Sequence, residues 1–454
     1  MQELKWVTQQ YNENILADFQ EKNVEEGKHG FGLQMELHFA HIIMLAEQGI
    51  ISKEEAGQLL AALQKLWDLG PDVIEIKPGL TDLFSNLQEW LVKEVGIDVG
   101  GKMHIGRSRN DMYGTLDRMI ARSYLIDFGE KLCILMEGLL EKCKENMDVV
   151  MPGYTHHDQH AQPTTMGHYM LWAFDVFYKD MTRALDCYQR MNYSAMGAAA
   201  LCGTGFPVNR ERMADLLGFD GVCENTIDAT SSRDFQFEMA SVFCIYLANL
   251  ARLSELMLIW NVREIDMIRM DRKYCSYSSI MPQKNNPIGI ENIRGAYEVS
   301  CGQLAGMFTV LKGMTPGSGR EICFTDELLG GIIAKTIPTP VFMRDMIRDM
   351  KVQKENCLRL AKEGFSTITE LADDMVRKKG QSFAFAHKVL SKLAAKCMDQ
   401  NIPCEEIDGQ MIDEIAMELF NRKVGFTDEE VRMALDPVEN VQMRKTRGGP
   451  APEE

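Results

Sequence analysis

The segment from Arg233 to Trp260 restricts the fold of this chain more than any other part of its sequence. Apolar side chains occur on nearly every side of the helix that this segment predicts: Phe235, Phe237, Met239, Val242, Phe243, Ile245, Leu247, Leu250, Leu253 and Leu256. A helix that is apolar on every side is buried on every side. We therefore expect it at the centre of a helical bundle, and we expect that bundle to continue between the subunits of an oligomer.

Other long helical patterns surround this one. They cover Asp111–Asn146, which would be on the order of 50 Å long, Thr164–Met191 and Ile288–Leu311. The sequence has no internal repeat and no alternation of strands with helices, and its few strand candidates do not form a sheet. The predicted fold class is therefore all-α. The expected domains are an N-terminal helical domain (1–105), a central helix-bundle domain (106–355) and a small C-terminal helical domain (356–454).

Charge and cysteine content exclude several classes of protein. The 454 residues carry a net charge of −17 and no dense run of Lys or Arg, so a nucleic acid is not an expected partner. Twelve cysteines lack metal-type spacing and fit reduced thiols in the cytoplasm. The polar first twenty residues do not resemble a signal peptide, and no run of eighteen apolar residues predicts a membrane span. We expect a cytoplasmic protein without a metal or a cofactor.

Four polar loops interrupt the long apolar helices: Gly101–Asp111, Pro152–Pro163, Asn192–Pro207 and Ser276–Glu291. The last is the most unusual, because two prolines, three serines, a lysine and two asparagines occur within sixteen residues. Polar loops on a rigid helical scaffold often carry function. The alternative is a set of solvated connections, which composition alone does not exclude.

If these loops converge, their side chains suit an anionic substrate. Arg107, Arg109 and Lys284 could bind carboxylates, with help from Asn110, Asn286 and Thr155. His156 or a serine could move a proton, and Lys284 could stabilise the charge that proton abstraction creates. Each residue also has a simpler interpretation. The arginines could form ion pairs at a helix start, His156 could be a packed or capping histidine, and Lys284 could be a solvated charge.

Several motifs resemble those of one protein family. Ser278 to Pro287 (Ser-Ser-Ile-Met-Pro-Gln-Lys-Asn-Asn-Pro) is similar to the signature of the aspartase/fumarase superfamily. The argininosuccinate lyase branch is indicated by His104 to Asp111 (His-Ile-Gly-Arg-Ser-Arg-Asn-Asp) and by Gly153-Tyr154-Thr155-His156 followed by Ala161-Gln162-Pro163. Further matches to that branch are Asp228-Ala229, Arg233-Asp234-Phe235, Leu371-Ala372-Asp373, Arg377-Lys378 and Ala386-His387.

The resemblance implies a fold and a reaction. The fold would be three mostly helical domains, with a central five-helix bundle that forms a twenty-helix core in a homotetramer. Each active site would be assembled from three subunits. The reaction would be a β-elimination that breaks a C–N bond of an N-substituted aspartate and releases fumarate, without a cofactor. The resemblance points first to cleavage of argininosuccinate to arginine and fumarate, a step of arginine biosynthesis.

The resemblance also implies roles for individual residues. Ser278 would be the catalytic base, and Lys284 and Asn286 would stabilise the aci-carboxylate intermediate. Thr155 and His156 would bind the departing side and assist proton transfer. The other expected site residues are Arg109 and Asn110 on the succinyl group, Glu291 as an orienting group, and Arg107, Gln162, Ser279 and Arg320 as substrate-binding residues. The loop that carries Ser278 would close over the substrate.

This sequence departs from the family pattern mainly around the leaving amine. Tyr277 replaces a glycine before the serines, and one additional residue after Thr155 makes His157 an alternative to His156. Ser318 to Glu321 replaces a Tyr-Asn-Arg-Asp stretch, Cys323 stands near a missing glutamine, and no Gly-Ser is evident at Gln34–Phe39. Two alternatives remain open: a lyase for another N-(dicarboxyethyl) amine, similar to ethylenediamine-disuccinate, and a non-catalytic structural relative similar to δ-crystallin.

Overall fold

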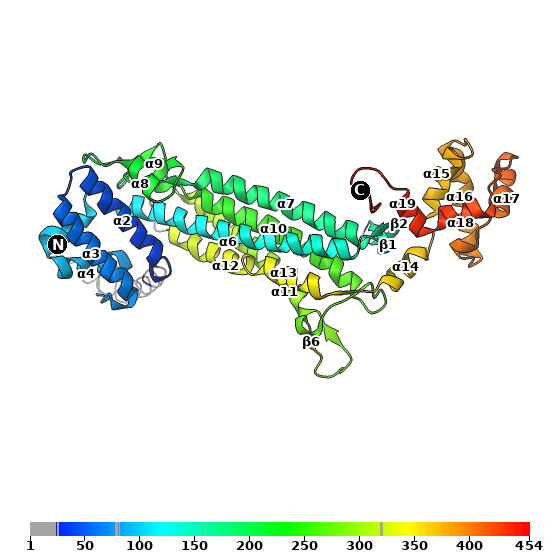
Figure 1. Ribbon diagram of the computed structural model, residues 1–454, viewed down its shortest axis with the longest axis horizontal. Helices are drawn as coiled ribbons and strands as arrows, with labels where there is room; N and C mark the ends of the chain where they lie inside the picture. The colour runs from blue at the N-terminus through cyan, green and yellow to red at the C-terminus, as the bar shows by residue number, and fades with distance from the viewer. Residues whose placement is uncertain (1–23, 25–26, 78–79, 81, 157, 318–320) are drawn as a thin grey trace. The chain divides into compact units, whose positions relative to one another are not determined.

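The computed structural model describes residue 24 and residues 27–77, 80, 82–156, 158–317 and 321–454. The chain divides into two compact units. Unit 1 comprises residues 1–129, 182–244 and 299–337, and unit 2 comprises residues 130–181, 245–298 and 338–454. Four long helices contribute residues to both units (Figure 1): α6 (Arg109–Glu145), α7 (Met166–Met191), α10 (Asp234–Trp260) and α11 (Ile288–Gly313).

The remaining elements of unit 1 are short. They are α2 (Phe31–Glu47), α3 (Lys53–Leu69), η1 (Pro71–Val73), α4 (Leu83–Val95), α5 (Ile97–Gly100), η2 (Gly101–His104), β3 (Tyr193–Ser194), α8 (Arg210–Leu216), β4 (Gly221–Val222), α9 (Thr226–Ser231) and α12 (Ile322–Thr336). Leu37, Leu59 and Leu63 are among the fully buried side chains of its main core. Ser52 and Glu55 form a capping box at the start of α3.

The remaining elements of unit 2 include most of the strands. They are β1 (Val150–Thr155), β2 (Gln159–Thr165), β5 (Ile268–Arg269), η3 (Arg272–Tyr274), β6 (Ser276–Tyr277), β7 (Asn285–Asn286), α13 (Thr339–Asp349), β8 (Lys351–Val352), α14 (Lys354–Lys362), α15 (Ile368–Arg377), α16 (Phe383–Asp399), η4 (Cys404–Glu406), α17 (Gly409–Phe420), α18 (Asp428–Leu435) and α19 (Pro437–Gln442). The C-terminal helices share a core of their own that includes Leu371, Val389, Leu393 and Ile412.

The helix predicted at Arg233–Trp260 is confirmed as α10. Its residues Leu247, Leu250 and Trp260 are fully buried, whereas Ile245 remains 41% exposed in the single chain. This helix is long and apolar enough to cross a membrane, and half of its most apolar eighteen-residue window is buried inside the structure. The core helix of a soluble bundle has the same length and composition.

The all-α class is confirmed, although the described residues also form four small two-stranded sheets. Pro152–Pro163 was expected to be a polar loop and is instead most of the β1–β2 hairpin, in which Val150 pairs with Thr165 and Thr155 with Gln159. The register shifts between Pro152 and Tyr154, and this irregularity interrupts the period-two pattern by which a strand is recognised in a sequence.

Two helix boundaries have clear local causes. The cap of α4 is Asp82, whose side chain accepts a hydrogen bond from the Ser85 N–H at 2.8 Å. Pro338 and strand β8 separate α12, α13 and α14 from one another.

Candidate active site

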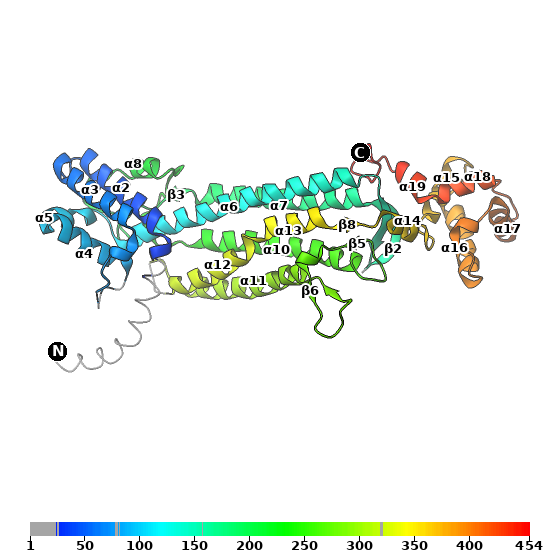
Figure 2. The same cartoon turned by 60° about the horizontal axis from the view of Figure 1, so that its bottom comes forward.

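The segment Ser276–Glu291 forms a β-hairpin that stands away from the helices of its own unit (Figures 1 and 2). Ser276 pairs with Asn286 and Tyr277 with Asn285. Because side chains alternate between the two faces of a strand, Ser276 and Asn286 lie on one face of the hairpin, and Tyr277 and Asn285 lie on the other. Ser278 follows β6 and Lys284 precedes β7, so these two residues flank the hairpin loop.

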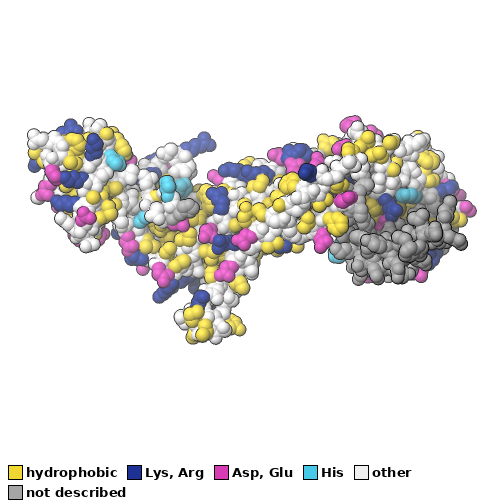
Figure 3. Space-filling model, turned by 180° about the vertical axis from the view of Figure 1, so that it is seen from behind, with side chains coloured by type: hydrophobic (Ala, Val, Ile, Leu, Met, Phe, Trp, Pro, Cys, Tyr) yellow, Lys and Arg dark blue, Asp and Glu magenta, His cyan; other side chains and the backbone are white. Residues whose placement is uncertain are grey.

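The hydroxyl of Ser278 receives backbone hydrogen bonds within the hairpin loop. Its Oγ accepts from the N–H of Met281 at 3.0 Å and from that of Ile280 at 3.4 Å. Ser279 and Lys284 are exposed. The tip also exposes apolar side chains: Tyr277 is 86% and Ile280 is 82% exposed. Figure 3 shows hydrophobic side chains gathered on this projecting lobe. Ser278 is therefore held by its own loop, close to water.

Tyr274, two residues before the start of β6, contacts α13. The hydroxyl of Tyr274 donates to Oδ2 of Asp349 at 2.7 Å, and Lys273 forms an ion pair with the same carboxylate at 2.5 Å. The Tyr274 ring packs edge-on against Phe342 at a centroid distance of 5.8 Å. Hydrogen bonds from Arg348, Lys273 and Tyr274 hold the pKa of Asp349 well below its usual range. The hairpin is thus fastened at its base and free at its tip.

The β1–β2 hairpin presents the second group of candidates in unit 2. His156 and Asp158 have positive φ angles of 48° and 65° in its turn, and Nδ1 of His156 lies 3.3 Å from Oγ1 of Thr155. Gln162 is exposed on β2. A side chain at Gly153 would place its Cβ 2.6 Å from the carbonyl oxygen of Gln162, so glycine allows this close approach of the two strands.

Arg109 and Asn110 belong to unit 1 and begin α6. Nη1 of Arg109 donates to Oδ2 of Asp82 at 2.8 Å, and the hydroxyl of Tyr113 donates to the same atom at 3.1 Å. The side-chain amide of Asn110 donates to the carbonyl oxygen of Ala200 at 2.9 Å. Two of the four polar loops, Gly101–Asp111 and Asn192–Pro207, therefore meet in this unit.

Arg107 lies in a different environment from Arg109. It is buried, with Nη1 3.1 Å from Nδ1 of His38 and Nε 3.3 Å from Nδ1 of His104, and it covers the Phe84 ring. Burial lowers the pKa of Arg107 to about 9 and that of His104 to about 4, and it lowers the pKa of His38 well below its usual value. In this structure Arg107 anchors its loop to the histidines.

The other predicted site residues are placed as follows. Glu291 is exposed in the first turn of α11. Arg320 and the alternative histidine His157 lie outside the described residues. Sequence reasoning assigned no role to Asp82 or Asp111, although both make several hydrogen bonds beside Arg109. The spacing Ser108-x-x-Asp111, which resembles a capping box, was the available signal for the second of these.

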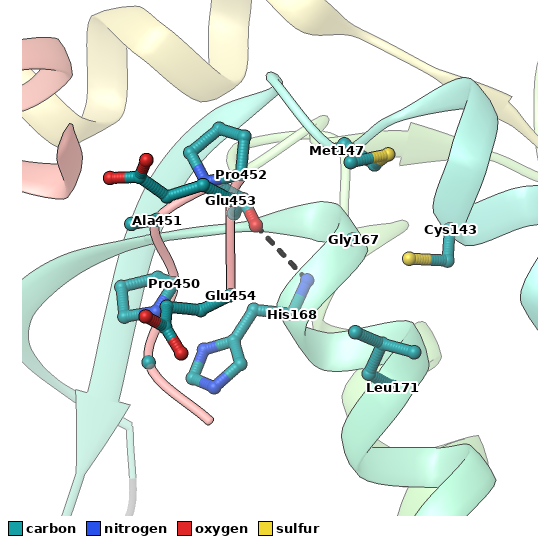
Figure 4. A pocket seen from close by; sticks show the side chains of 12 residues that line it. Cys143, Met147, Gly167, His168, Leu171, Pro450, Ala451, Pro452, Glu453 and Glu454 are labelled. Atoms are coloured by element: carbon teal, nitrogen blue, oxygen red, sulfur yellow. Dashed lines mark hydrogen bonds between the residues drawn. The ribbon is translucent and has the colours of Figure 1, made fainter. Parts of the chain in front are cut away.

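One cavity in unit 2 is separate from the candidate residues. It has a volume of about 330 Å³ and lies between the start of α7, the end of α6 and the C-terminal segment (Figure 4). His168 lines it, and Nε2 of His168 is 3.0 Å from the carbonyl oxygen of Gly448. None of the predicted site residues lines this cavity. Within the described part of the chain, no cluster of His, Cys, Asp and Glu side chains is arranged to hold a metal ion.

Comparisons with known proteins match almost the whole chain. A lyase family model matches residues 8–303, and an argininosuccinate lyase C-terminal model matches residues 365–442. The argininosuccinate lyase of Methanosarcina acetivorans is 38% identical over 424 residues, which cover 93% of this chain and 85% of the relative. That of Methanocaldococcus jannaschii is 37% identical, with 91% and 84% covered.

Comparisons with solved structures also find related lyases. EDDS lyase in complex with formate has a TM-score of 0.85 and 31% identity, with 96% of this chain and 86% of that chain covered. A class II fumarase from Schistosoma mansoni has a TM-score of 0.74 at 17% identity, covering 93% of each chain, and shows the shared fold. The chain therefore belongs to the argininosuccinate lyase family of the aspartase/fumarase superfamily and is a carbon–nitrogen lyase.

Proposed function

We propose that this enzyme cleaves argininosuccinate into arginine and fumarate by β-elimination. The observation that supports the site assignment is the β6–β7 hairpin, whose loop is flanked by Ser278 and Lys284 and whose second strand contains Asn286. A base, a cation and an amide donor are the groups that proton abstraction beside a carboxylate requires. The curated relatives that carry the name argininosuccinate lyase support this choice of substrate.

In the proposed mechanism, Oγ of Ser278 removes the proton from the carbon next to a carboxylate. The N–H groups of Met281 and Ile280 already point at this oxygen and would stabilise its negative charge before the proton is taken. The electron pair moves into the carboxylate and forms a dianionic aci-carboxylate, which Lys284 and Asn286 stabilise. The electron pair then returns, the C–N bond breaks, and fumarate forms.

The departing amine needs a proton, and the β1–β2 hairpin supplies candidates for that step. His156 sits in the exposed turn beside Thr155. A histidine can deliver a proton near neutral pH. Thr155 and Gln162 would bind the leaving side of the substrate, and Ser279 and Arg320 its other polar groups. Glu291 would orient the histidine.

Arg109 and Asn110 would hold the succinyl carboxylates. They belong to unit 1, whereas Thr155 and His156 belong to unit 2. From the resemblance to the family, we propose that each site combines residues from different copies in a homotetramer, with three subunits contributing, and that the enzyme works in the cytoplasm.

A second candidate function is cleavage of another N-(dicarboxyethyl) amine. The similarity to EDDS lyase favours it, as do the departures from the family pattern at Tyr277 and at Ser318 to Glu321. Both candidates leave the fumarate half of the reaction unchanged. They differ only in the amine that leaves.

An assay of fumarate absorbance distinguishes between these candidate substrates. Purified enzyme would be incubated with argininosuccinate, ethylenediamine-disuccinate and a panel of other N-substituted aspartates. We expect fumarate from argininosuccinate at the highest kcat/KM. Release from another substrate alone would replace the leading assignment with the second candidate, and release from none would favour a non-catalytic relative. Light scattering at the mass of a monomer would contradict the shared site.

A further inference from the structure

Asp111 occupies an unusual position in unit 1, because its carboxylate joins two loops. Oδ1 accepts a hydrogen bond from the N–H of Ser108 at 2.9 Å. Oδ2 accepts from the N–H of Gly197 and from the N–H of Ala199, both at 2.9 Å. The side chain is fully buried.

The bond to Ser108 alone would have a local explanation. Ser108 precedes α6, its Oγ accepts from the N–H of Asn110 at 3.3 Å, and its own N–H donates to Asp111, so both side chains satisfy backbone N–H groups at the start of the helix. A capping acid needs only one oxygen for this role. The second oxygen of Asp111 is used for a segment almost ninety residues later in the chain, which capping does not explain.

That segment has a backbone shaped to bind an anion. Gly197 and Ala199 both have positive φ angles, 81° and 52°, and their N–H groups converge on the same oxygen. Successive backbone N–H groups arranged in this way form a concave site for negative charge. A left-handed alanine is strained, and such a conformation persists only where its surroundings require it. The hydrogen bond to the carboxylate of Asp111 holds Ala199 in this conformation.

The segment held by Asp111 lies directly beside the proposed substrate-binding side chains. The amide of Asn110 donates to Ala200, the residue next to Ala199. One turn further along α6, Oγ1 of Thr115 accepts from the N–H of Ala195 at 3.1 Å. Hydrogen bonds thus join the first two turns of α6 to the segment 195–200. The orientation of the Asn110 amide therefore depends on the position of that segment.

We propose that Asp111 is a positioning residue for dicarboxylate binding: by holding the segment 197–200 against the first turn of α6, it fixes the orientation of Asn110 and the start of the helix that carries Arg109. The inference rests on the proposed function, because the roles of Arg109 and Asn110 belong to it. Asp111 itself does not contact the substrate.

The charges around Asp111 supply an independent readout. Burial raises the pKa of Asp111 to about 6, against the opposing effects of its three backbone hydrogen bonds and of Arg107. Arg107 is in turn held by His38 and His104, and the segment 197–200 contributes only backbone N–H groups to the carboxylate. The N–H groups of Gly197 and Ala199 favour the charged carboxylate, so protonation below about pH 6 weakens their hold on it while Asp111 stays buried. Unfolding of the whole protein, which exposes Asp111, has the opposite pH dependence because it loses the burial that favours the neutral acid.

The first test compares Asp111→Asn with the wild-type enzyme. An asparagine offers one acceptor oxygen in place of two, so one of the two loops must lose its bonds. We expect KM for argininosuccinate and Kd for fumarate to rise about tenfold or more, since a lost buried hydrogen bond has this magnitude, while kcat changes less than about threefold. The wild-type KM should rise as the pH falls through 6, and the variant should lack that step.

Asp117→Asn is the matched control. Asp117 lies six residues further along α6, and its carboxylate pairs with Arg233 at 2.9 Å. Its loss should alter thermal stability without the change in KM or the loss of the pH step. A KM for Asp111→Asn within about twofold of the wild-type value, or an equal rise in both variants, would overturn the proposal.

Hydrogen exchange of the wild-type protein tests the inference even if Asp111→Asn does not fold. Peptides covering residues 192–207 should lose protection as the pH falls from 7 to 5, after correction for intrinsic exchange rates, while peptides from α3 should not. Unchanged protection in 192–207 would refute the coupling. This measurement needs no substrate, so it remains decisive if the enzyme releases fumarate from none of the panel and the proposed function fails.

Discussion

Tyr274 and Asp349 join the base of the β6–β7 hairpin to helix α13 through a 2.7 Å hydrogen bond from the phenol to the carboxylate. Asp349 also forms an ion pair with Lys273 and accepts a hydrogen bond from Arg348, so its negative charge is compensated without the tyrosine. The phenol therefore restrains the hairpin more than it stabilises the acid. The free tip and the fastened base are what a closing lid requires.

Tyr274→Phe should loosen this base. The variant keeps the ring contact with Phe342 but loses the hydrogen bond, which contributes about 1 kcal/mol. We expect faster proteolysis and faster hydrogen exchange within residues 275–287, together with a lower kcat. Tyr178→Phe, at an exposed tyrosine of α7, is the control. Equal proteolysis rates in the two variants would show that Tyr274 does not restrain the hairpin.

Ser278→Ala should abolish turnover, because Ser278 is the base in the proposed mechanism. A loss of about a thousandfold in kcat is the usual magnitude for removing a general base. The oligomer mass by light scattering should not change, since the side chain bonds only within its own loop. Ser279→Ala should lower the rate much less. A variant with the wild-type rate would remove Ser278 from the role of base.

Gly153→Ala should destabilise the β1–β2 hairpin. The new Cβ would lie 2.6 Å from the carbonyl oxygen of Gln162, and backbone on both sides would have to move. Overpacking of this kind costs about 1–3 kcal/mol, and it would displace Gln162 and the His156 turn as well. We expect a lower melting temperature and a lower kcat/KM. Gly57→Ala, in the exposed open face of α3, should instead stabilise by about 0.5–1 kcal/mol. Equal melting temperatures would contradict the contact.

Asp111 should make the stability of the fold depend on pH in an unusual direction. Its pKa is about 6 in the folded protein and about 3.9 when unfolded, so between these pH values the native state holds a proton that the unfolded chain lacks. The contribution of Asp111 to stability is therefore greatest below about pH 4 and declines by about 3 kcal/mol as the pH rises through 6. Thermal unfolding of wild type and Asp111→Asn from pH 4 to 8 measures this difference. Parallel curves would exclude a buried carboxylate with a raised pKa.

Sequence periodicity was sufficient for the long helices and insufficient for the pairing of strands. α6 and α10 begin and end within a residue or two of the predicted limits, because helical spacing is maintained over many turns. The β1–β2 hairpin was missed, since Pro152 and Gly153 interrupt the alternation that a strand would show. No helix was predicted at α17, although Asp408 caps it.

The candidate site was predicted by residue type but not by arrangement. The motif around Ser278 is recognisable from its order of residues alone, whereas the hairpin that carries the motif is defined by the pairing of Ser276 with Asn286. Likewise, the sequence places Asp111 next to Asn110 without revealing that its second oxygen reaches Gly197. Contacts between distant segments depend on packing that no local pattern encodes.

The alternation within β6 has a practical consequence for Tyr277. Its side chain is 86% exposed and projects from the hairpin face opposite Ser276 and Asn286. A cysteine introduced there could carry a fluorophore on the proposed lid, and stopped-flow emission during turnover would then report whether the hairpin closes and opens. Tyr277, which departs from the family pattern, would then serve as the labelling site for measurements of hairpin motion.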